Sequence, residues 1–106
     1  MHVFIIKRQY FVYYVYMQNK DTKSLYLREV IGNTIKNLRE KQNISANKLT
    51  NEYDIASGNL SRIENAVIDC KVITLWRISE ALNMKFSELA KCIEDNLEKN
   101  FKLIDE

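Results

Sequence analysis

The chain has 106 residues, 46% of them hydrophobic and 28% charged, with a formal net charge of +2. These values are typical of a globular protein with one domain. The chain contains no proline and only two glycines, so helices are favoured over a many-stranded sandwich or barrel. The small net charge excludes a histone-like coat of basic residues, and any positive surface must therefore be local.

The sequence offers no pattern of metal-binding or catalytic residues. Cys70 and Cys92 lie far apart, and the only histidine is His2, so no metal-ligand spacing occurs. A glycine-rich phosphate loop and a recognisable catalytic cluster are also missing from the sequence. We therefore expect no enzyme, no cofactor and no metal. Free thiols in the cytoplasm are expected, and a Cys70–Cys92 disulfide is the less favoured alternative.

Residues 1–17 (MHVFIIKRQYFVYYVYM) are rich in β-branched and aromatic residues, which favours an extended, strand-like segment. No small-residue cleavage site follows, and the run is shorter than the roughly 20 apolar residues that span a bilayer. Three interpretations stay open. The segment packs on the domain or on a second copy, the protein starts at Met17, or the segment is a membrane-surface anchor. Residues 18–24 are polar and predict a linker, so we expect residues 1–24 to form an extension.

From Ser24 onward the apolar residues recur every three or four positions, the period of a helix. The first predicted helix covers residues 25–41, with Ser24 as its N-cap. Its apolar stripe comprises Leu27, Val30, Ile31, Ile35 and Leu38.

Two short helices are predicted next. The first covers residues 46–53, with Ser45 as N-cap and with Leu49 and Tyr53 facing inward. Asp54 tolerates a left-handed turn, and Ile55 is expected to bury its side chain there. The following helix covers residues 56–65, with Leu60 and Ile63 facing inward.

Two further helices complete the predicted domain. One covers residues 73–82, buries Leu75, Ile78, Ala81 and Leu82, and is followed by Asn83 as a C-terminal cap. Trp76 lies beside this inward stripe, as a core or dimer-surface residue. The other starts near Phe86 and runs to about Lys99. We thus expect an all-α, five-helix domain over residues 25–99 and a tail over residues 100–106, whose apolar residues extend the domain or contact a second subunit.

Two short helices joined by a tight turn, the second rich in small polar residues, are typical of a helix-turn-helix. Small polar side chains suit a helix that enters the major groove of DNA, which is about as wide as a helix. The segment over residues 45–89 resembles the phage-repressor family of helix-turn-helix domains (Cro and CI type, XRE-like). The resemblance rests on the ordered set Gly32, Leu38-Arg39, Ser45, Leu49, Ile55 and LSRIEN at 60–65.

The resemblance implies a lambda-repressor-like domain that binds double-stranded DNA sequence-specifically, as a homodimeric transcriptional regulator. The base-reading positions that it implies are Ser57, Gly58 and Arg62. The implied groove or phosphate contacts are Asn47, Lys48, Asn59, Ser61 and Asn65. Arg39 and Glu64 are implied to form an ion pair that holds the first helix to the recognition helix.

The sequence departs from the family pattern at residues near the expected DNA surface. Ala46 replaces a glutamine that contacts phosphate, and Asp54 and Ala66 replace glycines. Fewer phosphate contacts predict weak, salt-sensitive binding. The alternative is a protein–protein interaction module on the same scaffold, with Val67-Ile68 and the N-terminal segment as its contact surfaces.

Overall fold

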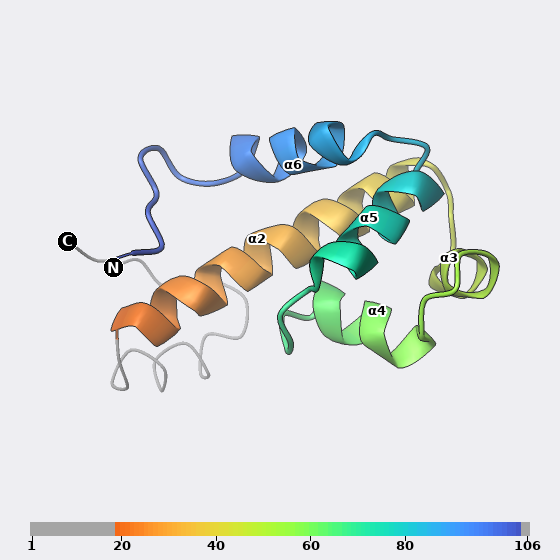
Figure 1. The fold of residues 1–106 in the computed structure, drawn as a ribbon, viewed down its shortest axis with the longest axis horizontal. Coiled ribbons are helices and arrows are strands. Elements are labelled where there is room, and N and C mark those ends of the chain that lie inside the picture. Colours follow the sequence, from red (N-terminus) through yellow and green to blue (C-terminus); the bar gives the residue numbers. More distant parts are fainter. Residues whose placement is uncertain (1–18, 105–106) are drawn as a thin grey trace.

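The computed structural model describes residues 19–104, with side chains from Thr22 onward. The expectations for the extended N-terminal segment, including a start at Met17 and a membrane-surface anchor, lie outside the described residues. Within residues 19–104 the chain forms five α-helices and no strand, which confirms the expected all-α class (Figure 1). The helices are α2 (Asn19–Lys41), α3 (Ala46–Glu52), α4 (Ser57–Glu64), α5 (Val72–Ala81) and α6 (Phe86–Asp95).

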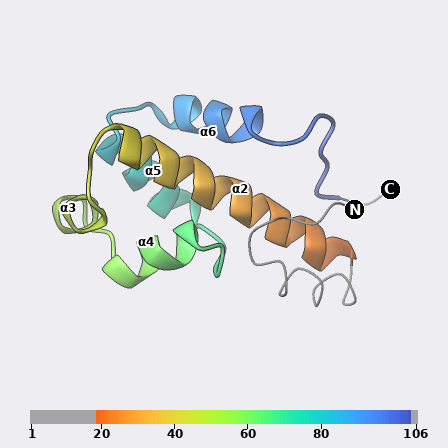
Figure 2. The same ribbon diagram turned by 180° about the vertical axis from the view of Figure 1, so that it is seen from behind.

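The long helix α2 is the axis on which the other helices are arranged. Figures 1 and 2 show α6 and α4 on opposite sides of α2, with α3 at the end where α2 stops. The core lies between these elements and takes residues from every helix. Its fully buried members are Ile35, Leu49, Leu60, Ile78, Leu82 and Leu89. The inward stripes that the helical period predicted therefore meet in one cluster.

Helix α2 begins at Asn19, six positions before the predicted start at residue 25, so the prediction of a linker and of Ser24 as N-cap is wrong. The polar stretch has no glycine or proline to end a helix. The C-terminal segment contacts the helix just after this stretch, where Tyr26 packs on Phe101 with ring centroids 5.3 Å apart. The expected boundary at residue 24 thus falls inside this helix.

The turn between α3 and α4 follows the sequence prediction closely. Ser45 caps α3, and its side-chain oxygen accepts a hydrogen bond of 3.1 Å from the backbone N–H of Lys48. Asp54 has a left-handed φ of 55°, and the side chain of Ile55 is buried. The prediction that Tyr53 faces inward is wrong, since it is exposed. Helix α3 ends one residue earlier, at Glu52, so Tyr53 leaves its inward face.

Ala66 and Asn83, which follow α4 and α5, also have left-handed backbones, with φ of 62° and 58°. Asparagine tolerates this conformation, as expected for Asn83, whereas alanine adopts it at a cost of about 1–2 kcal/mol. A glycine at position 66 would avoid that cost. Ala66 therefore adopts a left-handed backbone although alanine does not favour it.

Helix α6 ends at Asp95, so its predicted extension to about Lys99 is wrong. The side-chain amide of Asn96 donates to the hydroxyl oxygen of Thr34 at 2.9 Å, which draws the chain toward α2. Beyond it, the backbone N–H of Glu98 donates to the hydroxyl of Tyr26 at 2.9 Å. The residues after α6 therefore continue along α2 toward its first turns and extend the domain.

The two cysteines are unpaired, as expected. Burial raises the pKa of the Cys70 thiol to about 11, so this thiol stays protonated near neutral pH and behaves as a small apolar side chain. No helix within residues 19–104 is long and apolar enough to cross a membrane.

Two contacts hold α4 against α2. The first is a close approach at Gly32, where a Cβ would collide with the carbonyl oxygen of Ile63 and lie 2.9 Å from that of Glu64. The second is the ion pair of Arg39 and Glu64, joined by Nε–Oε2 and Nη2–Oε1 bonds of 2.8 and 2.9 Å. The same guanidinium donates to the carbonyl of Ile44 at 3.0 Å.

The Arg39–Glu64 pair lies largely out of solvent, with side-chain exposures of 11% and 9%. The hydrogen bond to Glu64 raises the pKa of Arg39 above its usual value, so the guanidinium stays charged at any physiological pH. Its planar fork matches the two carboxylate oxygens, which fixes the orientation as well as the distance. Together with Gly32, the pair sets how α4 lies on α2.

We predict that Gly32→Ala destabilises the domain by about 1–3 kcal/mol, because the added methyl group must push two helix backbones apart. Urea unfolding followed by circular dichroism measures this change. Gly58→Ala is the matched control, since a Cβ there meets only the end of the flexible Arg62 side chain. The control should leave stability unchanged or raise it by up to about 1 kcal/mol. Equal losses in the two variants would contradict the close approach.

We predict that Arg39→Ala costs about 3 kcal/mol of unfolding free energy, because it leaves the Glu64 carboxylate without its partner in a poorly solvated place. Arg39→Lys should recover only part of the loss, since an ammonium cannot match both oxygens. The control is Lys91→Ala, which removes an exposed pair with Asp95 at 3.3 Å and should cost less than about 1 kcal/mol. A loss of unfolding free energy for Arg39→Ala as small as that for Lys91→Ala would show that the Arg39–Glu64 pair has no structural role.

Candidate nucleic-acid interface

The outer side of α4 is exposed, and it carries most of the residues singled out from the sequence. Leu60 and Ile63 turn inward and are 1% and 3% exposed. The opposite side, here named the α4 face, comprises Ser57, Gly58, Ser61, Arg62 and Asn65, all exposed. Asn59 is exposed at its edge. The face is composed of small or polar residues, with one long cationic side chain.

The α4 face is organised by contacts within the helix. The guanidinium of Arg62 lies over Gly58, so close that a Cβ built on this glycine would be 3.0 Å from Nη1. The same nitrogen is 3.5 Å from the Asn59 side-chain oxygen, to which it donates. Asn65 donates to the Ser61 carbonyl at 2.8 Å. The Arg62 side chain is thus held by a weak contact and can reach outward without breaking a buried interaction.

Asn47 and Lys48, the predicted residues of α3, are also exposed. They lie in the first turn of α3, which Ser45 caps. The Lys48 ammonium is 4.0 Å from the Glu52 carboxylate, and both side chains are more than half exposed. Such a pair is weak, so Lys48 is available to another anion.

The structure adds a residue that the sequence reading missed. The Arg77 guanidinium of α5 lies 4.0 Å from the Asp54 carboxylate, in the turn before α4. Both line a cavity of about 270 Å³, together with Ile55, Ala56, Asn59 and Thr74. No local pattern in the sequence could have found Arg77, because its place depends on how α5 packs against α3. It brings a positive charge beside the acidic turn.

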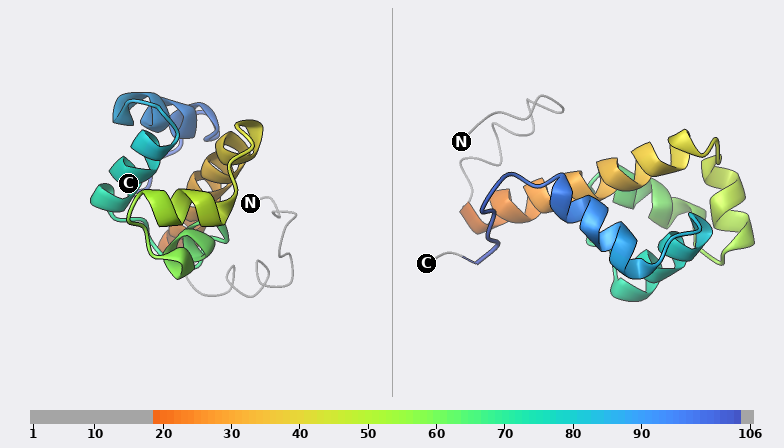
Figure 3. Two further views of the ribbon diagram at one scale, coloured as in Figure 1. Left: turned by 90° about the vertical axis from the view of Figure 1, so that its right-hand side faces the viewer. Right: turned by 90° about the horizontal axis from the view of Figure 1, so that it is seen from above.

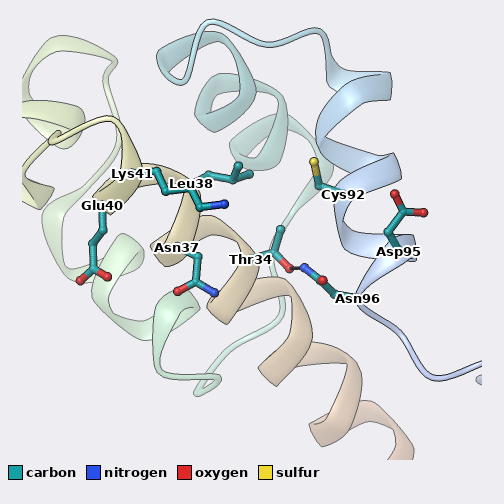
Figure 4. A pocket seen from close by; sticks show the side chains of 8 residues that line it. All are labelled: Thr34, Asn37, Leu38, Glu40, Lys41, Cys92, Asp95 and Asn96. Atoms are coloured by element: carbon teal, nitrogen blue, oxygen red, sulfur yellow. Dashed lines mark hydrogen bonds between the residues drawn. The ribbon is translucent and has the colours of Figure 1, made fainter.

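A second cavity, of about 620 Å³, lies between α2 and α6 (Figure 4). Figure 4 shows the Thr34–Asn96 hydrogen bond at its lining, with Cys92 and Asp95 on the α6 side. Its polar groups join the two helices, and α4 does not contribute to it. Nowhere in residues 19–104 do three or more His, Cys, Asp or Glu side chains gather in a way that could hold a metal ion.

Comparisons with known proteins give structural neighbours only, since no protein-family model and no curated protein matches the sequence. Two crystal structures of the clp gene regulator ClgR from Corynebacterium glutamicum match with TM-scores of 0.60 and 0.63, at 19% and 18% identity. They cover 65% and 70% of this chain, and 73% and 96% of their own. An HTH_3 family transcriptional regulator from Vibrio cholerae matches with a TM-score of 0.60 and 25% identity, over 67% of this chain and 40% of its own.

The matched regulators therefore share the arrangement of helices that positions α4. The turn between α3 and α4, the inward Leu60 and Ile63 and the outward polar face are present in the structure. The resemblance inferred from the sequence is confirmed, and the chain has the helix-turn-helix fold of the phage-repressor type (Cro and CI, XRE-like).

Proposed function

We propose that this chain is a transcriptional regulator that binds double-stranded DNA sequence-specifically and reads the major groove with α4. The observation that carries the proposal is the α4 face. It is exposed and free of large apolar side chains, and it projects from a helix that is held rigidly on its other side. The regulators that share the fold support it.

The proposed base-reading residues are Ser57, Gly58 and Arg62. The small side chain of Ser57 lets the helix approach base edges closely. Gly58 has no side chain, so the helix backbone itself can approach them. Arginine is the commonest partner of guanine and forms two parallel hydrogen bonds to it. We assign groove or phosphate contacts to Asn59, Ser61 and Asn65 on α4 and to Asn47 and Lys48 on α3.

The charge around this surface predicts modest non-specific affinity. Lys48 and Arg62 are the cations of α3 and α4, whereas Glu52 and the 94%-exposed Asp54 oppose them. Phosphate neutralisation supplies essentially all non-specific binding to DNA. We therefore expect specificity to rest on base contacts by α4, and we expect affinity to fall only gradually as salt rises, because few phosphates are neutralised.

We further propose that the chain acts as a homodimer in the cytoplasm, without enzymatic activity. An eight-residue helix contacts few base pairs, so two copies on half-sites about 34 Å apart, one DNA turn, would double the contact. We retain residues 25–99 as the centre of the proposed DNA-binding unit, to which α2 adds residues 19–24 and the Tyr26–Phe101 contact adds the start of the tail over residues 100–106. The unpaired thiols suit a reducing compartment.

Selection of duplexes from a random library tests the proposal. The chain should enrich a defined sequence, bind it more tightly than random DNA, and lose affinity for both as salt rises. Arg62→Ala should lower the discrimination at one base position by about 1–3 kcal/mol. Lys48→Ala should weaken all duplexes about equally, and Lys99→Ala is the matched surface control. Equal affinity for selected and random duplexes, or no binding at low salt, would contradict the proposal.

We also predict that Asp54→Asn raises the affinity for every duplex by a factor of about 2–5, since it removes a repulsion of about 0.4–1 kcal/mol from phosphate. Asparagine accepts the left-handed φ of 55° as well as aspartate does, so the fold is kept. Titration at two salt concentrations measures the gain, which should shrink at the higher one. Glu94→Gln on α6 removes an equal charge on the other side of α2 and should change nothing.

A further inference from the structure

Helix α5 carries an apolar patch that is exposed among the described residues 19–104. Val72, Ile73 and Trp76 are 63%, 66% and 50% exposed and lie on one side of the helix. The Trp76 ring stacks on Phe86 of α6, with centroids 4.6 Å apart and planes 5° from parallel. This stacking fixes the orientation of a half-exposed tryptophan. We name these four residues the α5 patch.

The α5 patch is separate from the core contacts of α5, which use Ile78 and Ala81 in the helix and Leu82 at its end. Its three α5 residues follow α4 along the chain, after the loop over residues 65–71. In the left view of Figure 3, α5 forms an outer flank of the molecule and α4 lies below it. The α5 patch shares no residue with the α4 face.

The charges along α5 make the patch complementary to itself. The first turn of α5 has no acidic residue and no side-chain cap, and it is preceded by Lys71, so this end is positive. Glu80 is exposed and lies on the same side as Ile73 and Trp76, at spacings of seven and four. A two-fold axis at Trp76 would place each α5 residue of one copy opposite the α5 residue of the other copy that lies equally far from Trp76 in the opposite direction along the chain. Glu80 would then meet the positive first turn of α5 in the other copy.

We propose that the α5 patch binds the α5 patch of a second copy, with the two helices antiparallel and Trp76 at the centre. The contact is isologous, as a two-fold dimer requires, and it buries a rigid aromatic anchor, the kind of residue that dominates interface energies. The inference rests on the proposed function, because it names the surface by which two α4 faces are presented together to two half-sites.

Sedimentation equilibrium of the full chain tests the contact, alone and with a selected duplex. The wild type should sediment as two copies of 12.6 kDa, and the emission of Trp76, the only tryptophan, should shift to the blue as dimer forms. Ile73→Glu should give one copy, with an unchanged circular dichroism spectrum. Glu80→Lys should weaken the dimer, and the double change Lys71→Glu with Glu80→Lys should restore it. Ile104→Glu, at a residue that is 77% exposed outside the patch, is the control.

The outcomes separate the two proposals. A mass of one copy under both conditions, or a dimer that Ile73→Glu leaves intact, overturns the α5 contact. Ile73→Glu that sediments as one copy but still binds a single half-site supports the contact and the proposed function together. A dimer that responds to these changes while no duplex is bound would support the contact and overturn the DNA-binding role.

Discussion

The contact between α2 and α4 is the constraint on which the rest of the structure depends. At Gly32 the two helices approach so closely that no side chain fits between them. About two turns further along α2, the Arg39 guanidinium donates two hydrogen bonds to the Glu64 carboxylate. A close approach fixes distance, and a planar ion pair fixes rotation. With both fixed, α4 has one side for the core and one for solvent.

This division explains the chemistry of the outer surface. Leu60 and Ile63 supply the burial that α4 needs, so the remaining positions carry no structural demand and can be small or polar. The surface has few cations, and one of them, Arg77, lies 4.0 Å from the Asp54 carboxylate. A protein of this kind gains little from bulk electrostatics. It depends on shape and on a small number of directed hydrogen bonds, which require the rigid support that α2 provides.

Where local rules governed the structure, the sequence predicted it well. Helical periodicity located the inward residues of α4 and α5, and the capping rules located Ser45 and the left-handed Asp54 and Asn83. Predictions failed where contacts between distant segments decided the outcome. Helix α6 ends before its predicted limit, and the chain beyond it bonds to α2 through Asn96 to Thr34 and Glu98 to Tyr26. Propensity and spacing carry no information about such contacts.

The sequence by itself determined the helical class, the turn chemistry around α4 and the separation of apolar from polar positions, because each depends on neighbours within a few residues. Only the tertiary structure placed Arg77 beside Asp54, stacked Trp76 on Phe86 and left the α5 patch open. Those arrangements follow from the angles at which helices pack. Packing angles are set by the whole core at once, and no single segment encodes them.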